Sequence, residues 1–337
     1  MTILRGKPLA DWKGQVLPKT RQQLDDFSEQ GIVSTLREMF YTLVELNVIP
    51  KTEAAYHALS NHTARWREDG TLPIDCFADR TRSVVKDFND SFITIEDYAD
   101  KAFSYLENVH RNYSIPRWHK QPNHVEVWLE KDAAVESIRS IVIDVHVMVV
   151  PNRGHSSVAF LNLNIDRLKK KQSEDKSIII LYLGDADPSG EVMDKIYERK
   201  LEGYGIFNVT FVRVAVTKEQ IERFNLLHDP DPETLRKLKA DPNKEAFKKK
   251  YGLKSDDELF AVQLEAMFTP SVRTHMKNLL IDRIDGLFDN RIYEQAQSEK
   301  PKQTEVDGLV LSKIRRFERS MSLNLGSKQE GKRKSTK

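Results

Sequence analysis

Cysteine is almost absent from this sequence: Cys76 is the only one among 337 residues. A single thiol cannot form a disulfide within the chain, which excludes a disulfide-stapled secreted domain. Long apolar runs are also missing, and none approaches the roughly 20 residues of a membrane-spanning helix. The opening residues, MTILRGKPLADWKGQ, lack the apolar region of a signal peptide. We therefore expect a cytoplasmic chain with no membrane partner.

The sequence has no large excess of charge of one sign. Lys and Arg number 53 against 51 for Asp and Glu, a net charge of +2, so overall charge does not indicate a nucleic-acid partner. Basic residues do cluster at 169–171, 248–250 and 328–337. Such clusters can neutralise phosphates, and solvated helix faces with a disordered tail are the simpler interpretation. Cys and His pairs with zinc spacing are absent.

The N-terminal third has helical periodicity. In GIVSTLREMFYTLVEL, apolar Leu36, Phe40 and Leu43 recur at spacings of three and four. A second helix is expected over 52–69, followed by a short extended segment, TLPIDCFADRTR. A further helix is expected over 94–110. Helices that end in a small β-wing form a winged helix-turn-helix of the CAP-like kind.

In a winged helix the 52–69 helix would be the recognition helix. His62, Arg65 and Arg67 would then face DNA. Helix pairs of this kind also occur in proteins that never bind nucleic acid, so the pattern alone does not decide.

Beyond Pro116 and Pro122, β-rich runs alternate with helical stretches. The runs lie at 124–130, 144–150, 177–185 and 208–216, and the helices between them at 131–140, 156–171 and 190–203. This alternation predicts an α/β domain whose parallel sheet is covered by helices on both faces.

The predicted organisation has four parts and one insertion. The parts are a winged-helix domain over 1–112, a linker over 113–122, a metal-binding α/β domain over 123–297, and a basic, partly disordered tail over 298–337. The polar insertion at 228–258 precedes a helical segment around 271–296 and has no assigned role.

Three carboxylates are expected at one edge of the sheet. Glu130 ends the first strand, and Asp185 and Asp187 end the third. The carboxyl ends of parallel strands share one edge, where functional groups gather. Packed carboxylates repel one another unless they are neutralised, and Mg²⁺ prefers oxygen ligands of this kind. The simpler interpretation, in which the aspartates only cap the next helix, leaves Glu130 unexplained.

Three further side chains are candidate phosphate contacts. Lys131 follows Glu130 directly, and Arg153 with His155 lies in the loop PNRGHSS after the second strand. A solvated lysine and ordinary turn chemistry are equally good interpretations of these positions.

These motifs resemble a known family. VEVWLEK followed by LYLGDADPSG resembles the Toprim domain, the metal-binding fold shared by topoisomerases, bacterial primases and several nucleases. LREMFYTLVEL is similar to the R-[DE]-hydrophobic-[FY]-Y motif of the type IIB topoisomerase (topoisomerase VI) A subunit and its relative, the meiotic double-strand-break transesterase. The resemblance covers most of 30–220, and 56–82 resembles short standalone A-subunit-like proteins of archaea and mobile elements. QLEAMFTP is similar to a QLEAL.P stretch of Toprim relatives and would place Glu265 near the metal.

The resemblance implies a role for each motif residue. Tyr41 would be the nucleophile, Arg37 the motif arginine, and Glu130, Asp185 and Asp187 the Mg²⁺ ligands. A phenol has a pKa near about 10, so attack on a phosphodiester needs a base or nearby positive charge, which Arg37 can supply. The product would be a 5′-phosphotyrosyl link. By periodicity alone, Tyr41 would instead be a core aromatic.

The family's tyrosine works with the metal of another subunit, so the resemblance implies a homodimer on double-stranded DNA, associated with the nucleoid. Strand passage would need a separate GHKL-type, B-like ATPase subunit, because no ATPase motif is present. Two other functions stay open. One is a hydrolytic Toprim nuclease of a defence or mobile-element system, and the other is a non-catalytic DNA-binding protein.

Overall fold

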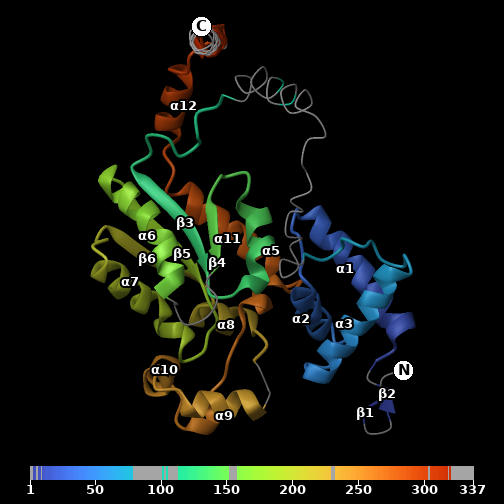
Figure 1. Ribbon diagram of the computed structural model, residues 1–337. Coiled ribbons are helices and arrows are strands. Elements are labelled where there is room, and N and C mark those ends of the chain that lie inside the picture. Colours follow the sequence, from blue (N-terminus) through green and yellow to red (C-terminus); the bar gives the residue numbers. More distant parts are fainter. Residues whose placement is uncertain are drawn as a thin grey trace, which may run out of the picture. The chain divides into compact units, whose positions relative to one another are not determined.

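The structure is a computed structural model that consists of two compact units (Figure 1). Apart from isolated positions and short pieces, it describes residues 10–78, 113–151, 158–228, 232–302 and 304–317. The first unit joins Met1–Arg82 to Gln121–Asp289, and the second joins Ser83–Lys120 to Asn290–Lys337. No helix in the described ranges combines the length and apolar character needed to cross a bilayer.

A four-stranded sheet lies at the centre of the first unit. Its strands are parallel, in the order β4-β3-β5-β6. They are β3 (Asn123–Leu129), β4 (Met148–Pro151), β5 (Ser177–Leu183) and β6 (Val209–Ala215). Leu129 pairs with both Pro151 and Leu183, so the residues that follow β3 and β5 meet at one edge. The predicted parallel sheet is confirmed.

Helices cover both faces of this sheet, as predicted (Figure 1). They are α5 (Val135–Val142), α6 (Val158–Ser173), α7 (Met193–Gly203) and α11 (Arg273–Asp285). Helix α8 (Lys218–Phe224) follows β6. On one face, Trp128 and Tyr182 pack against α6 and α7. Successive strand residues point to opposite faces, and Val127 and Leu181 on the other face are buried as well. The sheet is therefore a two-sided core.

Three N-terminal helices belong to the same unit. They are α1 (Leu17–Glu29), α2 (Leu36–Glu45) and α3 (Glu53–Glu68). Thr35 and Thr52 cap α2 and α3 with their side chains, so both predicted helices are confirmed. All seven residues from 38 to 44 are buried, because α2 packs against α1, α3 and the 3₁₀ turn Leu264–Phe268. Helix α2 is therefore a core helix and not a surface one.

The segment after α3 is not extended over 71–78, contrary to the prediction. The chain turns back instead, with Leu72 N donating to Trp66 O at 2.7 Å and Ala78 N donating to Ser34 O at 2.9 Å. Pro73 has no N–H for a strand ladder. The remainder of the expected wing and the helix predicted over 94–110 lie outside the described residues, apart from positions 101 and 104.

The boundaries of other elements differ from the prediction as well. Strand β4 begins at Met148 because a turn with positive φ at His146 follows α5. The helical segment predicted around 271–296 is two helices, α11 and α12 (Asn290–Ser298). They are separated where the side chain of Gln121 bonds both to the N–H and to the carbonyl of Asp289, each at 2.9 Å.

The polar insertion is folded. Helices α9 (Pro232–Ala240) and α10 (Lys244–Tyr251) enclose a small apolar core around Leu238 and Phe247. Its lysines are paired with acids: Lys248 with Asp256 at 2.6 Å, and Lys250 with Glu191 at 2.5 Å. The cluster at 248–250 is therefore largely neutralised within the chain.

A buried carboxylate joins β3 to α6. Glu126 is fully buried and accepts hydrogen bonds from Arg167 Nε and Nη2, at 2.8 and 2.9 Å, and from Trp128 Nε1 at 2.9 Å. Burial alone would raise its pKa, but these bonds and that of His124 outweigh burial and hold the pKa at about 2. The ionised pair with Arg167 is thus part of the folded core.

We expect Glu126→Ala to lower the free energy of unfolding by about 3 kcal/mol, since it leaves Arg167 without its buried partner. Chemical denaturation near pH 7 measures this loss. Glu222→Ala is the matched control, because it removes an exposed i,i+4 ion pair with Lys218 and should change stability by less than about 1 kcal/mol.

The ion pair of Glu126 with Arg167 makes the free energy of unfolding depend on pH. A pKa depressed to about 2 gives stability above the unfolded pKa near about 4.5, and that stability is lost as pH falls through 4.5 toward 2. The difference in unfolding free energy between the wild type and Glu126→Ala should therefore become smaller as the pH falls through this range. A gap that stays constant down to pH 2 would contradict this account.

Candidate functional site

The structure brings the three predicted carboxylates together beyond β3 and β5. Glu130 N donates to Leu183 O at 3.0 Å, and Asp185 N donates to Glu130 Oε2 at 2.8 Å. Asp187 Oδ1 accepts from Gly190 N at 2.7 Å. Backbone hydrogen bonds of the sheet edge and of the following turn thus hold Glu130 and Asp187 in place.

Two glycines make room for Glu130. A Cβ on Gly184 would lie 2.7 Å from Glu130 Oε2, and a Cβ on Gly190 would lie 3.2 Å from both Glu130 Oε2 and Asp187 Oδ1. The carboxylates of Glu130 and Asp187 therefore face each other across a space that even a methyl group would fill.

The cluster is electrostatically crowded. Burial, reinforced by Asp185 and Asp187, raises the pKa of Glu130 to about 7. Burial also raises the pKa of Asp187. These shifts express the cost of ionising neighbouring carboxyl groups in a poorly solvated site.

Lys131 supplies one neutralising charge. Its ammonium is paired with Asp185, whose other oxygen accepts from Leu264 N at 2.9 Å. Burial would lower the pKa of Lys131, but Asp185 and Glu265 outweigh this effect and raise it. Lys131 is therefore an ion-pair partner inside the site and not a fully solvated side chain, although 41% of its side chain is exposed.

Glu265 is a fourth carboxylate beside this cluster. Its side chain is 1% exposed and pairs with Arg37 of α2, Nε to Oε1 at 3.1 Å, while Arg37 Nη2 donates to Gln263 Oε1 at 2.7 Å. Neither oxygen of Glu265 accepts a well-formed hydrogen bond, and burial raises its pKa. Only the QLEAMFTP similarity pointed to Glu265, and its pairing with Arg37 had no sequence signal.

Glu38, the residue after Arg37, fixes α2 against α5. Its Oε2 accepts from Thr35 N at 2.7 Å and from Ser137 Oγ at 2.6 Å. The side chain is fully buried, and burial raises its pKa to about 8. Glu38, the acidic residue of the tyrosine motif, thus makes a structural contact with α5.

Arg213 on β6 holds the turn between β5 and α7. Its guanidinium donates to the carbonyl oxygens of Asp185 at 2.5 Å, Gly190 at 2.9 Å and Gly184 at 3.3 Å. These bonds fix the backbone that carries Asp185 and Asp187. Sequence analysis missed Arg213, because nothing in a strand pattern shows which side chain will reach a distant turn.

Tyr41 lines a cavity of about 600 Å³ together with Arg37, Lys51 and Tyr56. Only 2% of Tyr41 is exposed, and Lys51 Nζ lies 5.1 Å from its ring centroid. Burial lowers the pKa of Arg37, but Glu265, Tyr41, Tyr56 and Asp185 together raise it. The charge of Arg37 therefore interacts with both the tyrosine and the carboxylate cluster.

The three candidate DNA contacts on α3 differ in their surroundings. The His62 ring stacks on Trp12, with centroids 4.3 Å apart. Arg67 Nε donates to Thr63 O at 3.3 Å, and Arg65 is exposed. Arg153 and His155 lie outside the described residues.

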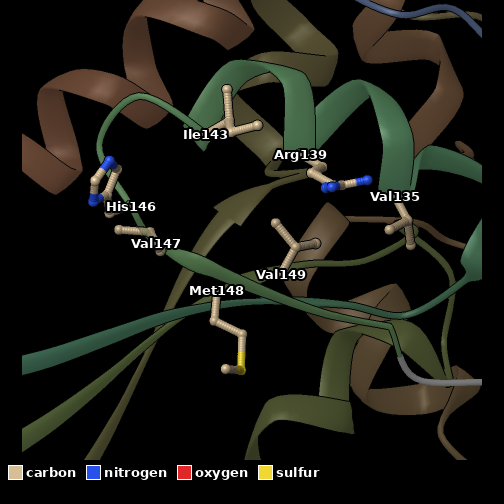
Figure 2. A pocket seen from close by; sticks show the side chains of 7 residues that line it. All are labelled: Val135, Arg139, Ile143, His146, Val147, Met148 and Val149. Atoms are coloured by element: carbon tan, nitrogen blue, oxygen red, sulfur yellow. The ribbon is translucent and has the colours of Figure 1, made fainter. Parts of the chain in front are cut away.

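A second cavity, of about 420 Å³, lies between α5 and the edge strand β4 (Figure 2). Arg139 and Val135 border it from α5, and His146 lies on the turn that leads into β4. None of the clustered carboxylates lines this cavity, so it is separate from the candidate site.

The donor set suits a hard divalent cation in its chemistry. The raised pKa of Glu130 and the unbonded Oε2 of Glu265 show that added positive charge would be favourable here. The glycines leave space for an ion beside Glu130. In the described part of the chain, however, no three Asp, Glu, His or Cys side chains are already arranged as ligands of one ion. Binding would require Lys131 to release Asp185.

Comparisons with known proteins give no relative: no family model, no curated protein and no solved structure matches the chain.

We expect Gly190→Ala to lower the free energy of unfolding by about 1–3 kcal/mol, as overpacking does. Its Cβ would lie 2.5 Å from the Asp185 carbonyl oxygen, which is backbone and cannot rotate away. Gly203→Ala is the control, because its Cβ meets nothing within 4 Å at the end of α7. Thermal unfolding of the two variants should separate them, and equal stabilities would show that the space beside Glu130 is not tight.

Proposed function

We propose that this chain cleaves DNA phosphodiester bonds with Mg²⁺ at the carboxylate cluster and with Tyr41 as the nucleophile. The observation that carries the proposal is the Arg37–Glu265 ion pair of 3.1 Å. It ties the helix that bears Tyr41 to the sheet edge that bears Asp185. One guanidinium thereby adjoins Tyr41 and the carboxylate cluster of the same chain.

In this mechanism Glu130, Asp185 and Asp187 would hold Mg²⁺, and the bound ion would supply positive charge near the departing 3′ oxygen. Arg37 and Lys131 bind phosphate oxygens through charge-assisted hydrogen bonds. The Tyr41 hydroxyl loses its proton to solvent and its oxygen bonds to phosphorus. The bond from phosphorus to the 3′ oxygen breaks, and that oxygen takes up a proton. A 5′-phosphotyrosyl link remains.

The proposal includes a homodimer, in which the tyrosine of one subunit acts at the cluster of the other. This arrangement comes from the family resemblance. Within one chain Tyr41 is 2% exposed and lines the cavity beside Arg37. Attack on DNA therefore needs the phosphate to approach through that cavity.

Double-stranded DNA is the proposed substrate, and helices α1 to α3 are the proposed winged-helix reader. Arg65 is the exposed cation on α3 that suits a phosphate contact. Strand passage would need a separate GHKL-type ATPase subunit. The proposed location is the nucleoid within the cytoplasm.

A hydrolytic Toprim nuclease is the second candidate, and the burial of Tyr41 favours it. A side chain that is 2% exposed in a core helix is a natural structural residue, whereas Glu130 and Asp187 are partly accessible to water. In that mechanism water attacks phosphorus and the products carry free 5′ phosphates. A non-catalytic DNA-binding protein is the third reading, and it gives the cluster no chemical role.

We expect Tyr41→Phe to lose covalent attachment to supercoiled plasmid in Mg²⁺ by about 10³-fold or more, because the nucleophile is gone while the ring packing is kept. Reactions are stopped with detergent and analysed with and without protease, so that protein on broken ends is detected. Tyr113→Phe is the matched control at a 40% exposed tyrosine outside the cavity, and it should cleave like the wild type.

Asp185→Asn distinguishes the two catalytic hypotheses from the hypothesis of a non-catalytic DNA-binding protein. It should abolish breakage under both catalytic mechanisms, and leave every DNA-dependent activity intact if the chain only binds DNA. If Tyr41→Phe still yields linear DNA with free 5′ phosphates, the mechanism is hydrolysis and not transesterification.

A further inference from the structure

One serine hydroxyl on α5 lies between two oxygen acceptors. Ser137 Oγ is 2.7 Å from the carbonyl oxygen of Val33 and 2.6 Å from Glu38 Oε2, and both are hydrogen-bond distances. A serine hydroxyl has only one hydrogen to donate. If Ser137 donates to one of these oxygens, the contact with the other needs a hydrogen from a second group. The Val33 carbonyl has none, so the carboxyl group of Glu38 must supply it.

A hydrogen on Glu38 Oε2 satisfies both contacts. Glu38 then donates to Ser137 Oγ, and Ser137 donates to the carbonyl of Val33. Oε2 can still accept from Thr35 N, which lies 2.7 Å away, because a hydroxyl oxygen keeps its lone pairs. The result is an unbroken chain of hydrogen bonds from α2 through α5 to the segment before α2.

The surroundings of Glu38 disfavour an ionised carboxylate. The side chain is fully buried and Oε1 has no hydrogen-bond partner, so a full charge there would be poorly solvated. The N-terminus of α2 favours a negative charge. The bonds of Ser137 and Thr35 lower the pKa of Glu38 as well, but burial outweighs them and raises the pKa to about 8.

In the described part of the chain, no cation forms an ion pair with Glu38. From the 3₁₀ turn Leu264–Phe268, Glu265 acts on Glu38 by repulsion. Lys19 and Arg21 of α1 and Arg65 of α3 are exposed. Other charged groups on the elements around α2 are paired with one another: Arg37 with Glu265, Arg139 of α5 with Glu136, Arg273 of α11 with Asp26 of α1, and His57 of α3 with Glu53.

We propose that Glu38 is a neutral carboxylic acid in the folded protein and that its proton fastens α2 to α5. Arg37 and Tyr41 lie on the same helix, so ionisation of Glu38 would loosen the element that carries both. The proposal is independent of the proposed function, because it concerns how α2 is held and not the chemistry at the carboxylate cluster.

Infrared difference spectroscopy of the full chain tests the protonation state of Glu38. The C=O stretch of a carboxylic acid is well separated from the bands of a carboxylate. The wild-type spectrum minus that of Glu38→Gln, at about pH 6, should contain one carboxylic-acid band, which should fade as the pH rises through about 8. Glu68→Gln, which removes an exposed carboxylate at the end of α3, is the matched control and should give a carboxylate band instead. A carboxylate band for Glu38 at about pH 6 overturns the proposal.

Ser137→Ala keeps this test decisive if Glu38→Gln does not fold. In that variant the acid band of Glu38 should move, because its hydrogen bond to Ser137 is lost. A difference spectrum between the wild type and Ser137→Ala that contains no acid band overturns the proposal.

Hydrogen exchange of the α2 amides tests the link between the proton and the helix. The raised pKa means that the stabilisation is fully present below the unfolded pKa of about 4.5 and is lost as the pH rises through about 8. After correction for intrinsic exchange rates, protection of residues 36–45 in the wild type should fall over this range by up to about tenfold per pH unit relative to Glu38→Gln, which cannot ionise. Equal pH dependence of protection in the two chains overturns the proposal.

Discussion

The burial of neighbouring carboxylates at one edge of the sheet, together with their mutual repulsion, is the constraint on which this site depends. Glu130, Asp187 and Glu265 all have raised pKa values because burial removes the water that would otherwise solvate their charge. Lys131 and Arg37 oppose that repulsion from two directions. An arrangement of this kind stabilises a fold poorly, since well-packed apolar residues would serve as well or better.

The rest of the first unit fits around this constraint. Parallel strands bring the carboxylates to one edge, and Arg213 holds the turn that carries two of them. The ion pair of Arg37 with Glu265 draws helix α2 into the same core, while Glu38 fixes that helix on α5. The tyrosine motif and the sheet edge are therefore parts of one packed structure, although about 90 residues separate α2 from Glu130 in the sequence.

Much of the local structure could be predicted, and most of the long-range structure could not. The periodicity of apolar residues and the alternation of β-rich runs with helical stretches are local signals, so they predict the sheet, α2 and α3, and the shared edge of parallel strands predicts that Glu130 and Asp185 converge. The Arg37–Glu265 pair and the folded core of the insertion depend on contacts between distant residues, which leave no periodic trace. The turn at 71–78 was missed because its backbone bonds go to α3 and Ser34 and not to a neighbouring strand.

The central claim is that the clustered carboxylates form a site for a divalent cation. Isothermal titration of Mn²⁺ into the full chain near pH 8, where Glu130 with its pKa of about 7 is largely ionised, tests this claim most directly. The account predicts one strong site per chain that Asp185→Asn abolishes and that Asp282→Asn, at an exposed carboxylate on α11, leaves unchanged. Absence of Mn²⁺ binding to the wild type, or equal affinity of the wild type and both variants, would contradict the central claim.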